Sequence, residues 1–418
     1  MSTSKKTFTV KTLGCRTNQY ESQGFVDQLK SLGYVPAAEG EKADLCLVNS
    51  CTVTQSADST SRSTVRQIAK QNPGAQVIVT GCSAEQNPGD FLSIEGVTKV
   101  VSNADKESII ASLFPDIDVP EFSIKNFDAH TRAFVKVQDG CNSYCSYCII
   151  PYVRGRSRSR TIDEIILEVE DLVKNGYQEI VLTGINIGDF DGGGSHRLSD
   201  LVKAVDQVEG VNRVRISSID PDEVEDDLLD AVINGKHTCP SMHIVLQSGS
   251  NVTLKRMNRK YTRQIFFQTI ERLKNAHPDF TFTTDVIVGF PGETERDFEE
   301  TLQVIQKTQF VKVHVFPFSP RKRTRAAIMK NQISPQVIKE RKTKLIRAAE
   351  HIGFERRKDF IGREMVVLTE SGGFGHTENF LPVRIEGEPI AANQLVAVKL
   401  IENHPDGLLG VRIENLNS

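Results

Sequence analysis

Short apolar runs alternate with polar, helix-forming stretches through the first 120 residues. Strands that alternate with helices predict βαβ units, so we expect a Rossmann-like α/β domain with a parallel sheet over 1–120. Ligands of such sheets bind outside the carboxyl ends of the strands. The predicted strands are TFTVKTL (7–13), ADLCLVN (43–49), AQVIVTG (75–81) and TKVVS (98–102), with helices near 17–32 and 57–71.

The same alternation begins again after a linker predicted at 121–132 and continues over 133–332. Six βα repeats of about 35 residues predict a partial TIM-like barrel, because a closed barrel usually needs eight. Active residues of such a barrel belong at the carboxyl ends of its strands. The predicted strands are 134–138, 179–184, 213–218, 243–248, 282–290 and 311–318, with helices near 162–175, 198–208, 222–233, 262–276 and 294–308.

A charged stretch at 333–362 predicts a linker helix that packs along the barrel with its basic residues facing outward. Its apolar positions are Val337, Leu345, Ile346 and Ile352. Beyond it, at 363–418, short strands separated by Gly, Pro and Asn turns predict a small β-barrel of OB-like size. The expected fold class is therefore α/β, with an N-terminal parallel sheet, a central partial (βα)6 barrel and a C-terminal β-barrel.

The composition is that of a globular protein, since 39% of the 418 residues are hydrophobic and 25% are charged. No apolar run approaches the roughly 18 residues that cross a bilayer. The N-terminal segment STSKKTFTVKTLG has no apolar signal-peptide stretch, so we expect a cytoplasmic protein with no membrane partner. The formal charge of −3 gives no overall signal for nucleic-acid binding.

Three cysteines, Cys141, Cys145 and Cys148, form a C-x-x-x-C-x-x-C run directly after the first predicted barrel strand. Three thiolates can hold three irons of a four-iron cluster and leave the fourth iron open to a substrate or cofactor. Zinc is the main alternative, but a zinc site would want a fourth Cys or His nearby, and the nearest His on the C-terminal side is His196. A disulfide with a spare thiol fits a cytoplasmic protein less well.

Three further cysteines follow successive strands of the N-terminal sheet, each in a small-residue turn. They are Cys15 in LGC, Cys51 in NSC and Cys82 in TGC. Because the carboxyl ends of parallel strands share one edge, this pattern predicts a second three-thiolate site. The alternative is three unrelated free thiols. Cys46 and Cys239 are interpreted as core or incidental residues.

Local basic segments stand out more than the overall charge does. Arg154, Arg156, Arg158 and Arg160 alternate after the cysteine run, and RKRTR (321–325) places four cations in five residues. Alternating arginines in an extended loop would place their charges along one edge, which suits phosphates or the carboxylate of a cofactor. The alternative is a solvated basic loop.

The cysteine run resembles the motif of the radical S-adenosylmethionine (SAM) superfamily. The layout over nearly the whole chain resembles the methylthiotransferases, and the subtype motifs resemble the MtaB type. These motifs are KTLGCRTNQYES (11–22), NSCTVTQSAD (49–58), VTGCSAEQNP (79–88), CSYCIIPYVRGRSRSR (145–160), LQSGSNVTLKRMNRKYTRQ (246–264) and GHTENFLPV (375–383).

This resemblance implies two [4Fe–4S] clusters. Cys141, Cys145 and Cys148 would hold the cluster that binds SAM and yields a deoxyadenosyl radical, while Cys15, Cys51 and Cys82 would hold an auxiliary cluster that carries the sulfur. SAM would serve as both methyl donor and radical source. A radical suits the reaction, because the C–H bond at adenine C2 is unactivated and offers no easy route to acid–base or nucleophilic catalysis.

The MtaB type adds a methylthio group at C2 of N6-threonylcarbamoyladenosine beside the anticodon. The resemblance therefore implies the tRNA anticodon stem-loop as a partner, together with an unidentified flavodoxin- or ferredoxin-like electron donor. The C-terminal module resembles a TRAM domain, which binds RNA in this family. It also implies SAM contacts at strand ends, although an ordinary βα turn is the alternative for each. These residues are Thr183, Gly184, Asn186, Ser218, Gln247, Asp285 and Gly289.

Two departures from the family pattern affect substrate binding. FSPRKRTRAA (318–327) stands where a Gly-Thr-Pro-like segment is common, so that Arg323 and Arg325 replace smaller or stiffer residues. The module at 363–418 has four Lys plus Arg and eight Asp plus Glu, a net charge of 4 − 8 = −4. RNA recognition there should rest on a local surface around Arg384, Phe374 and Phe380, with phosphate contacts from the arginines of the barrel.

Three other functions remain open from the residues. The nearest is a methylthiotransferase for another tRNA adenosine or for a ribosomal protein side chain. A cobalamin-dependent radical SAM methylase would need a D-x-H-x-x-G signature, which the N-terminal domain lacks; the nearest string, DAHTRA (128–133), has no glycine. A non-catalytic, RNA-binding iron–sulfur protein is the third.

Overall fold

The computed structural model describes residues 6–126 and 131–413, so part of the predicted linker and the start of DAHTRA lie outside the described residues. The chain divides into two compact units. The first unit comprises Met1–Phe127, Asp139–Arg158 and Ser319–Ala327, and the second comprises Asp128–Gln138, Ser159–Phe318 and Ile328–Ser418. The cysteine run therefore belongs to the same unit as the N-terminal sheet, while the contiguous domain boundaries given above stay a prediction.

The first unit is built on a parallel sheet with strand order β2-β1-β3-β4-β5. The central strand, β3, is buried along its whole length, as expected of a parallel strand covered on both faces. The order matches the flavodoxin-like doubly wound sheet, in which ligands bind between the first and third strands. The strands are β1 (Thr7–Thr12), β2 (Val35–Pro36), β3 (Leu45–Ser50), β4 (Gln76–Gly81) and β5 (Val97–Val100).

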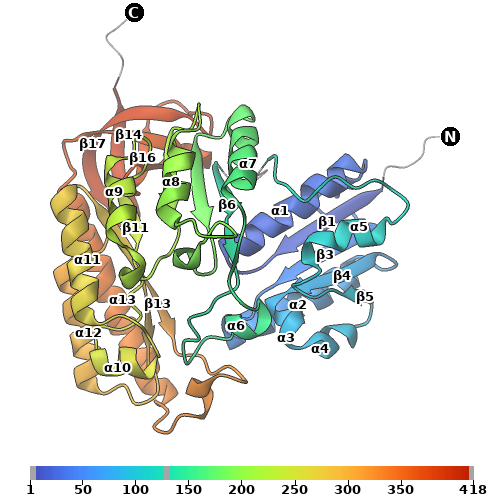
Figure 1. Cartoon of the computed structure of the whole chain (residues 1–418), viewed down its shortest axis with the longest axis horizontal. Coiled ribbons are helices and arrows are strands. Elements are labelled where there is room, and N and C mark those ends of the chain that lie inside the picture. The colour runs from blue at the N-terminus through green and yellow to red at the C-terminus, as the bar shows by residue number, and fades with distance from the viewer. Residues whose placement is uncertain (1–5, 127–130, 414–418) are drawn as a thin grey trace, which may run out of the picture. The chain divides into compact units, whose positions relative to one another are not determined.

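Helices cover both faces of this sheet (Figure 1). Phe25 and Leu29 of α1 pack on one face with residues of α5, whereas Val65 of α2 and Phe91 of α4 pack on the other. Thr54 caps α2, because its side chain accepts a hydrogen bond from Ala57 N. The helices are α1 (Arg16–Ser31), α2 (Gln55–Gln71), α3 (Cys82–Gln86), α4 (Pro88–Leu92), α5 (Ile109–Leu113) and α6 (Ile150–Val153).

The second unit contains two three-stranded parallel sheets, β10-β9-β6 and β11-β12-β13. Parallel bridges between Val214 and Thr238 and between Ile219 and Ile244 join them, so the predicted partial barrel is confirmed. Its strands are β6 (Arg132–Lys136), β9 (Glu179–Thr183), β10 (Arg213–Ile216), β11 (Ser241–His243), β12 (Thr281–Val288) and β13 (Lys312–Pro317). Its helices are α7 (Ile162–Lys174), α8 (Leu198–Asp206), α9 (Asp226–Asn234), α10 (Asn251–Arg256), α11 (Arg263–Ala276) and α12 (Glu295–Thr308).

One predicted barrel strand is displaced. The apolar run 243–248 predicts a strand there, but β11 ends at His243. The reason is local, because Leu246 N donates to the side chain of Thr284 and Gln247 adopts a left-handed φ of 58°. The run therefore leaves the regular ladder and forms an irregular strand end.

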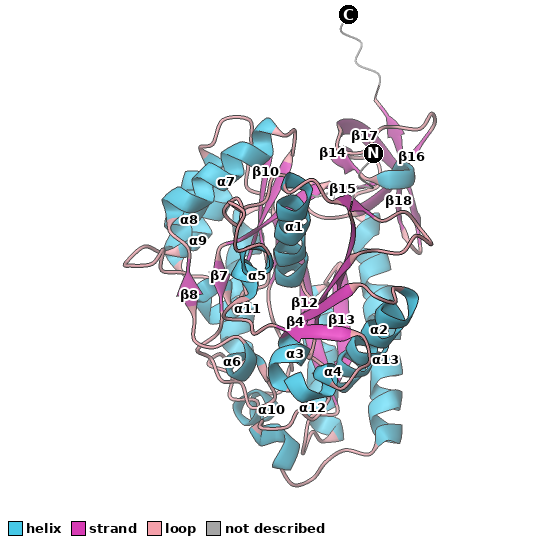
Figure 2. Cartoon of the chain, turned by 90° about the vertical axis from the view of Figure 1, so that its right-hand side faces the viewer, coloured by secondary structure: helices cyan, strands magenta, loops and turns pink. Residues whose placement is uncertain are grey.

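A long helix, α13 (Pro335–Lys358), leads to a closed barrel of order β14-β15-β16-β18-β17 (Figure 2). The predicted helix is confirmed, but its basic residues do not all face outward. Arg341 is buried and donates to Glu293 at 2.8 Å, and Arg357 is buried and donates to Asn403 at 3.0 Å. The barrel strands are β14 (Glu364–Thr369), β15 (Phe374–Thr377), β16 (Pro382–Glu386), β17 (Leu395–His404) and β18 (Gly407–Arg412).

Within the described part of the chain, no helix combines the length and the apolar character that a membrane span requires.

Candidate functional site

The three N-terminal cysteines lie at the carboxyl ends of three neighbouring strands. Cys15 follows β1 as the N-cap of α1, Cys51 comes directly after β3, and Cys82 comes directly after β4 as the first residue of α3. The predicted placement at one sheet edge is therefore found. Cys46, by contrast, is fully buried within β3.

A glycine brings two of these cysteine segments close together. Gly14 has a φ of 97°, which favours glycine, and a Cβ built at this position would lie 2.6 Å from Cys51 Sγ. The turn after β1 can approach the Cys51 thiol this closely only without a side chain. Gly14 therefore leaves space for the Cys51 sulfur, and it does so in a backbone conformation with positive φ.

Burial controls the protonation of these thiols. Burial, helped by the nearby Cys82 and Cys15 thiols and opposed by a backbone hydrogen bond from Val53 and by Arg154, raises the pKa of Cys51 to about 11. Burial also raises the pKa of Cys82, opposed by Arg154 and Lys106. Thiolates in this position need nearby positive charge, and metal binding supplies it. Three mutually interacting thiols at one sheet edge are a donor set that fits an iron–sulfur cluster.

The second cysteine set lies in the loop between β7 (Gln138–Asp139) and α6. Cys141, Cys145 and Cys148 are all partly exposed. Backbone bonds shape the loop, with Cys141 N donating to Gly155 O at 3.2 Å and Cys148 N donating to Cys145 O at 3.0 Å. Gly140 fits this loop because its φ is 73° and a Cβ would lie 2.0 Å from Arg156 O. The sulfurs sit on a short, accessible loop, which fits a cluster that must admit a small cofactor.

Arg154 connects the two cysteine sets within the first unit. It follows Cys148 by six residues, is buried, and donates through Nε to Cys82 Sγ at 3.3 Å. Its Nη1 donates to Glu21 at 3.0 Å and to Asp139 at 2.8 Å. Cys82 also packs against Ile149 and Val153 beside α6.

A buried charge network surrounds this arginine. Lys106 donates to Glu21 at 2.7 Å, so two buried cations face the carboxylates of Glu21 and Asp139. Although burial lowers the pKa of Arg154, Glu21, Cys82 and Asp139 outweigh it and raise that pKa well above its ordinary value. Arg154 is therefore permanently charged beside the Cys82 sulfur. Sequence reasoning missed this role, and also missed Glu21 and Lys106.

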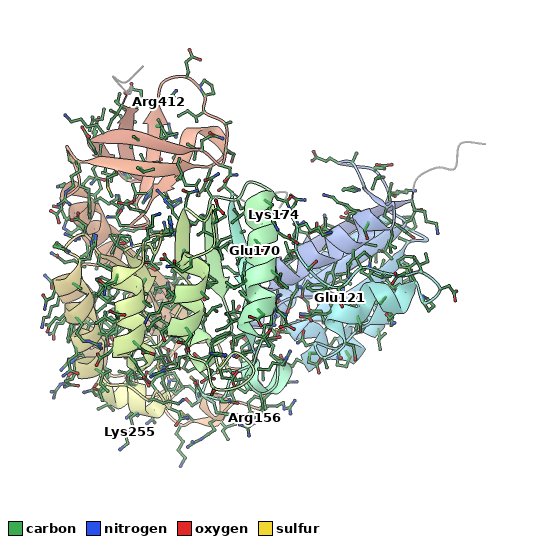
Figure 3. All side chains as sticks on the ribbon, turned by 45° about the horizontal axis from the view of Figure 1, so that its top comes forward. Glu121, Arg156, Glu170, Lys174, Lys255 and Arg412 are labelled. Carbon is green, nitrogen blue, oxygen red and sulfur yellow. The ribbon has the colours of Figure 1, made fainter. Side chains whose placement is uncertain are left out.

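The alternating arginines do not lie along one edge as predicted. Arg154 is buried, Arg158 donates to Asp139 at 2.7 Å, and Arg160 forms an ion pair with Glu168 at 2.7 Å. Arg156 and Arg158 are both exposed, and the Arg156 side chain lies on the surface of the first unit (Figure 3). In the other basic segment Arg321 is buried against Asp58. Carboxylates on neighbouring elements neutralise Arg154, Arg158, Arg160 and Arg321.

The predicted SAM contacts lie at or near strand ends of the second unit. Thr183 ends β9, and Gly184 and Asn186 follow it. Gln138 Oε1 shapes this turn by accepting hydrogen bonds from Ile185 N at 3.0 Å and Asn186 N at 2.9 Å. The remaining four are Ser218 after β10, Gln247 after β11, Asp285 within β12 and Gly289 after β12, and the role of all seven stays a prediction.

Two acidic residues of the second unit have unusual surroundings; Asp285 is one of the predicted SAM contacts, whereas Glu223 was not predicted from the sequence. Glu223 accepts a hydrogen bond from Asn186 at 3.1 Å, and burial, helped by Asp220, raises its pKa to about 7. Asp285 faces His243 and His314, and the ligand atoms of these three residues all lie within 4.8 Å of one another. His243 Nδ1 lies 2.9 Å from Thr283 Oγ1, which directs Nε2 toward Asp285 Oδ1 at 3.4 Å.

The C-terminal barrel retains only part of the predicted RNA surface. Arg384 lies over the Phe374 ring at 4.6 Å. Phe380, however, stacks on His376 and lies beneath Arg132 and Arg215 of the second unit. Its ring is partly buried and already contacts Arg132 of β6 and Arg215 of β10, both strands of the partial barrel.

Two family models match the chain. Residues 135–305 match the "Radical SAM superfamily", and residues 7–102 match "Uncharacterized protein family UPF0004". The first match covers the cysteine run and most of the partial barrel. The second covers the parallel sheet and all three N-terminal cysteines.

Similar proteins cover almost the whole chain. The "Threonylcarbamoyladenosine tRNA methylthiotransferase MtaB" of Chlamydia pneumoniae is 48% identical over 97% of this chain and 98% of that protein. The "tRNA-2-methylthio-N(6)-dimethylallyladenosine synthase" of Thermodesulfovibrio yellowstonii is 32% identical over 96% and 97%. Among solved structures, the radical SAM methyltransferase TsrM of Kitasatospora setae aligns with a TM-score of 0.56 at 12% identity, covering 75% of this chain and 73% of that one.

The structural likeness to TsrM shows a shared fold alone, so it does not revive the cobalamin-dependent alternative. The full-length sequence identity decides the family, and with it the choice between an enzyme and a non-catalytic scaffold. The chain belongs to the MtaB family of radical SAM methylthiotransferases.

Proposed function

We propose that this enzyme acts on tRNA and adds a methylthio group at C2 of N6-threonylcarbamoyladenosine beside the anticodon. The proposal is supported by the name of the 48% identical relative and by the subtype motifs, such as GHTENFLPV (375–383). The anticodon stem-loop would be the macromolecular substrate. A flavodoxin- or ferredoxin-like protein would supply the electrons.

We further propose that the enzyme holds two [4Fe–4S] clusters. Radical SAM enzymes carry one such cluster together with SAM, and the residues for it here are Cys141, Cys145 and Cys148. Cys15, Cys51 and Cys82 would hold the second. The observation that carries this proposal is the Arg154 side chain, which joins the Cys82 thiol to the segment that follows the cysteine run.

When bound, the two clusters and SAM supply a carbon radical and a methylated sulfur. The residues of the chain supply what those groups need. The fixed charges of Arg154 and Lys106 oppose the effect of burial, which raises the pKa of Cys82, and thereby offset part of the cost of forming its thiolate. Glu21 and Asp139 neutralise these cations and fix the guanidinium plane. The polar turns at Asn186 and Gln247 would orient SAM.

Metal content and product formation test the two cysteine sets separately. Anaerobically prepared enzyme should hold about eight irons per chain, and Cys51→Ala should retain about four. Cys145→Ala should abolish deoxyadenosine formation, whereas Cys51→Ala should cleave SAM without inserting sulfur. Cys46→Ala is the matched control, because this thiol is buried inside β3 and should leave the iron content unchanged. Full methylthiolation by Cys51→Ala would refute the second cluster.

Mass spectrometry of tRNA nucleosides identifies the substrate. Deleting the gene should remove 2-methylthio-N6-threonylcarbamoyladenosine and leave its unmodified precursor. The 32% identical relative carries the name of a dimethylallyladenosine enzyme, so the same spectra should be read for the dimethylallyl product. Loss of that nucleoside, with the threonylcarbamoyl product unchanged, would assign the alternative substrate.

A further inference from the structure

Two tyrosines and two arginines form an exposed cluster on the first unit, here called the tyrosine–arginine patch. The rings of Tyr144 and Tyr152 meet edge to face with centroids 6.1 Å apart. Arg156 lies over Tyr144 at 5.1 Å, and Arg323 lies over Tyr152 at 5.2 Å. The tyrosines are 37% and 40% exposed, which is high for large aromatic residues.

The patch adjoins the cysteine run. Tyr144 directly precedes Cys145, and Tyr152 lies in α6, four residues after Cys148. The segment that carries Arg323 is attached to the same loop, because Ala326 N donates to Ser146 O at 2.8 Å. A molecule bound on the patch would therefore lie beside the residues proposed to generate the radical.

The arginines of the patch differ from their neighbours in sequence. Arg154 and Arg321 are buried and paired with carboxylates. Within the described ranges 6–126 and 131–413, neither Arg156 nor Arg323 has an acidic partner within 4.0 Å. Their charges are thus left for a ligand, and anionic ligands with flat rings suit an arginine that lies on an aromatic face.

The backbone at the patch is strained. Arg323 has a φ of 75° and Tyr144 has a φ of 47°, in the left-handed region that favours glycine. Conformations of this kind persist where the surrounding structure enforces them, and they cluster at functional sites. The chain keeps a bulky cation at position 323, where a glycine would relieve the backbone.

We propose that the tyrosine–arginine patch binds the single-stranded RNA nucleotides that flank the target adenosine, stacking a base on Tyr152 and Arg323 and contacting phosphate through Arg156 and Arg323. The inference rests on the proposed function and specifies where its RNA substrate is held. Enzymes that modify a base act on unstacked nucleotides, and proteins bind such nucleotides through aromatic stacking and arginine.

RNA affinity measured at several salt concentrations tests the patch. A fluorescently labelled anticodon stem-loop is titrated with the full-length, cluster-loaded enzyme. Arg323→Gly should weaken binding about three- to tenfold and reduce the salt slope by about 1, because one phosphate contact is lost. Arg323→Lys should keep the salt slope but bind more weakly than the wild type. Tyr152→Leu should weaken binding at least about fivefold with the slope unchanged.

Arg296→Ala is the matched control, because this arginine is 88% exposed on α12 and should bind RNA like the wild type. Arg323→Gly relieves the positive φ, so its thermal stability should not fall, and weaker binding cannot be ascribed to unfolding. Wild-type affinity and salt slope in both Arg323→Gly and Tyr152→Leu would overturn the proposal. If the patch variants lose RNA binding while the wild type fails to modify threonylcarbamoyladenosine, the patch stands and the proposed substrate falls.

Discussion

The carboxylates beside the two proposed ligand sites are treated in opposite ways, although both units also contain buried ion pairs such as Arg341 with Glu293. In the first unit, the carboxylates near the cysteines are neutralised by cations, with Glu21 held by Arg154 and Lys106. In the second unit, Glu223 faces the neutral amide of Asn186, and it has no basic partner within 4.0 Å among the residues that the structure describes. Asp285 likewise faces imidazole rings.

This difference fits the ligands proposed for each unit. Thiolates are anionic, so a network that stabilises them must bring its own cations. SAM carries a sulfonium and an ammonium group, so a site for it can leave carboxyl groups without protein cations. At the cysteine site of the first unit, protein cations balance the carboxylates. At the proposed SAM site of the second unit, the positive charges of the bound SAM would balance them.

The largest test of this comparison removes the cation of the first unit. Arg154→Ala leaves Glu21 and Asp139 as buried carboxylates short of a partner, which should destabilise the protein by about 3–5 kcal/mol. Urea unfolding of the metal-free protein measures the loss. The variant should also retain fewer irons, because the Cys82 thiolate loses a hydrogen bond and a charge.

Arg158→Ala provides the matched control, since it removes an arginine from the same carboxylate. Arg158 is 54% exposed where it meets Asp139, so its loss should cost less than about 1 kcal/mol. An equal loss of unfolding free energy in Arg154→Ala and Arg158→Ala would show that the burial of Arg154 does not strengthen its ion pairs.

The second test addresses the unbalanced carboxyl group of the second unit. Burial raises the pKa of Glu223 from its ordinary 4.5 to about 7 in the folded protein. The neutral form is favoured by folding, so the stability that it contributes is present below pH 4.5 and is lost as pH rises to about 7. The shift corresponds to about 3 kcal/mol.

Urea unfolding of wild type and Glu223→Gln between pH 5 and pH 8 measures this effect. The wild type should lose stability relative to the variant as pH rises, and added SAM should reduce the difference if Glu223 lies near the bound cation. Glu170→Gln is the control, because this glutamate is exposed on α7 (Figure 3). A constant gap between wild type and Glu223→Gln would contradict the assignment.

The placement of the cysteines could be predicted from sequence, whereas their charged surroundings could not. Cys15, Cys51 and Cys82 follow apolar strands, and parallel strands bring their carboxyl ends to one edge regardless of sequence separation. Arg154, in contrast, looks like its solvated neighbours, and its partner Glu21 lies 133 residues away. Only tertiary packing decides which arginine of an alternating run is buried.

The partial barrel shows the same limit at β11 and at the group formed by His243, Asp285 and His314. The apolar run over 243–248 is compatible with a strand, but β11 ends early where Leu246 N donates a hydrogen bond to the Thr284 side chain instead of to a neighbouring backbone carbonyl. His243 and His314 meet Asp285 only because three neighbouring parallel strands align them. The hydrophobic pattern of a strand predicts which face of the sheet each residue occupies. It does not predict which residues of the neighbouring strands lie beside it.

The smallest expected effect on stability concerns the space around the Cys51 sulfur. Two glycine-to-alanine variants separate the effect of backbone strain from that of steric crowding. Gly14→Ala adds a Cβ that would lie 2.6 Å from Cys51 Sγ at a φ of 97°, whereas Gly74→Ala adds one at a φ of 87° with nothing within 4 Å. Both variants pay the strain of a left-handed alanine, about 1–2 kcal/mol. Gly14→Ala should lose about 1–3 kcal/mol more, because an overpacked contact forces a shift. It should also lower the iron content toward that of Cys51→Ala, since displacing the sulfur disturbs the donor set. If both alanine variants are equally stable and equally loaded with iron, the close approach at Cys51 is not what the glycine provides.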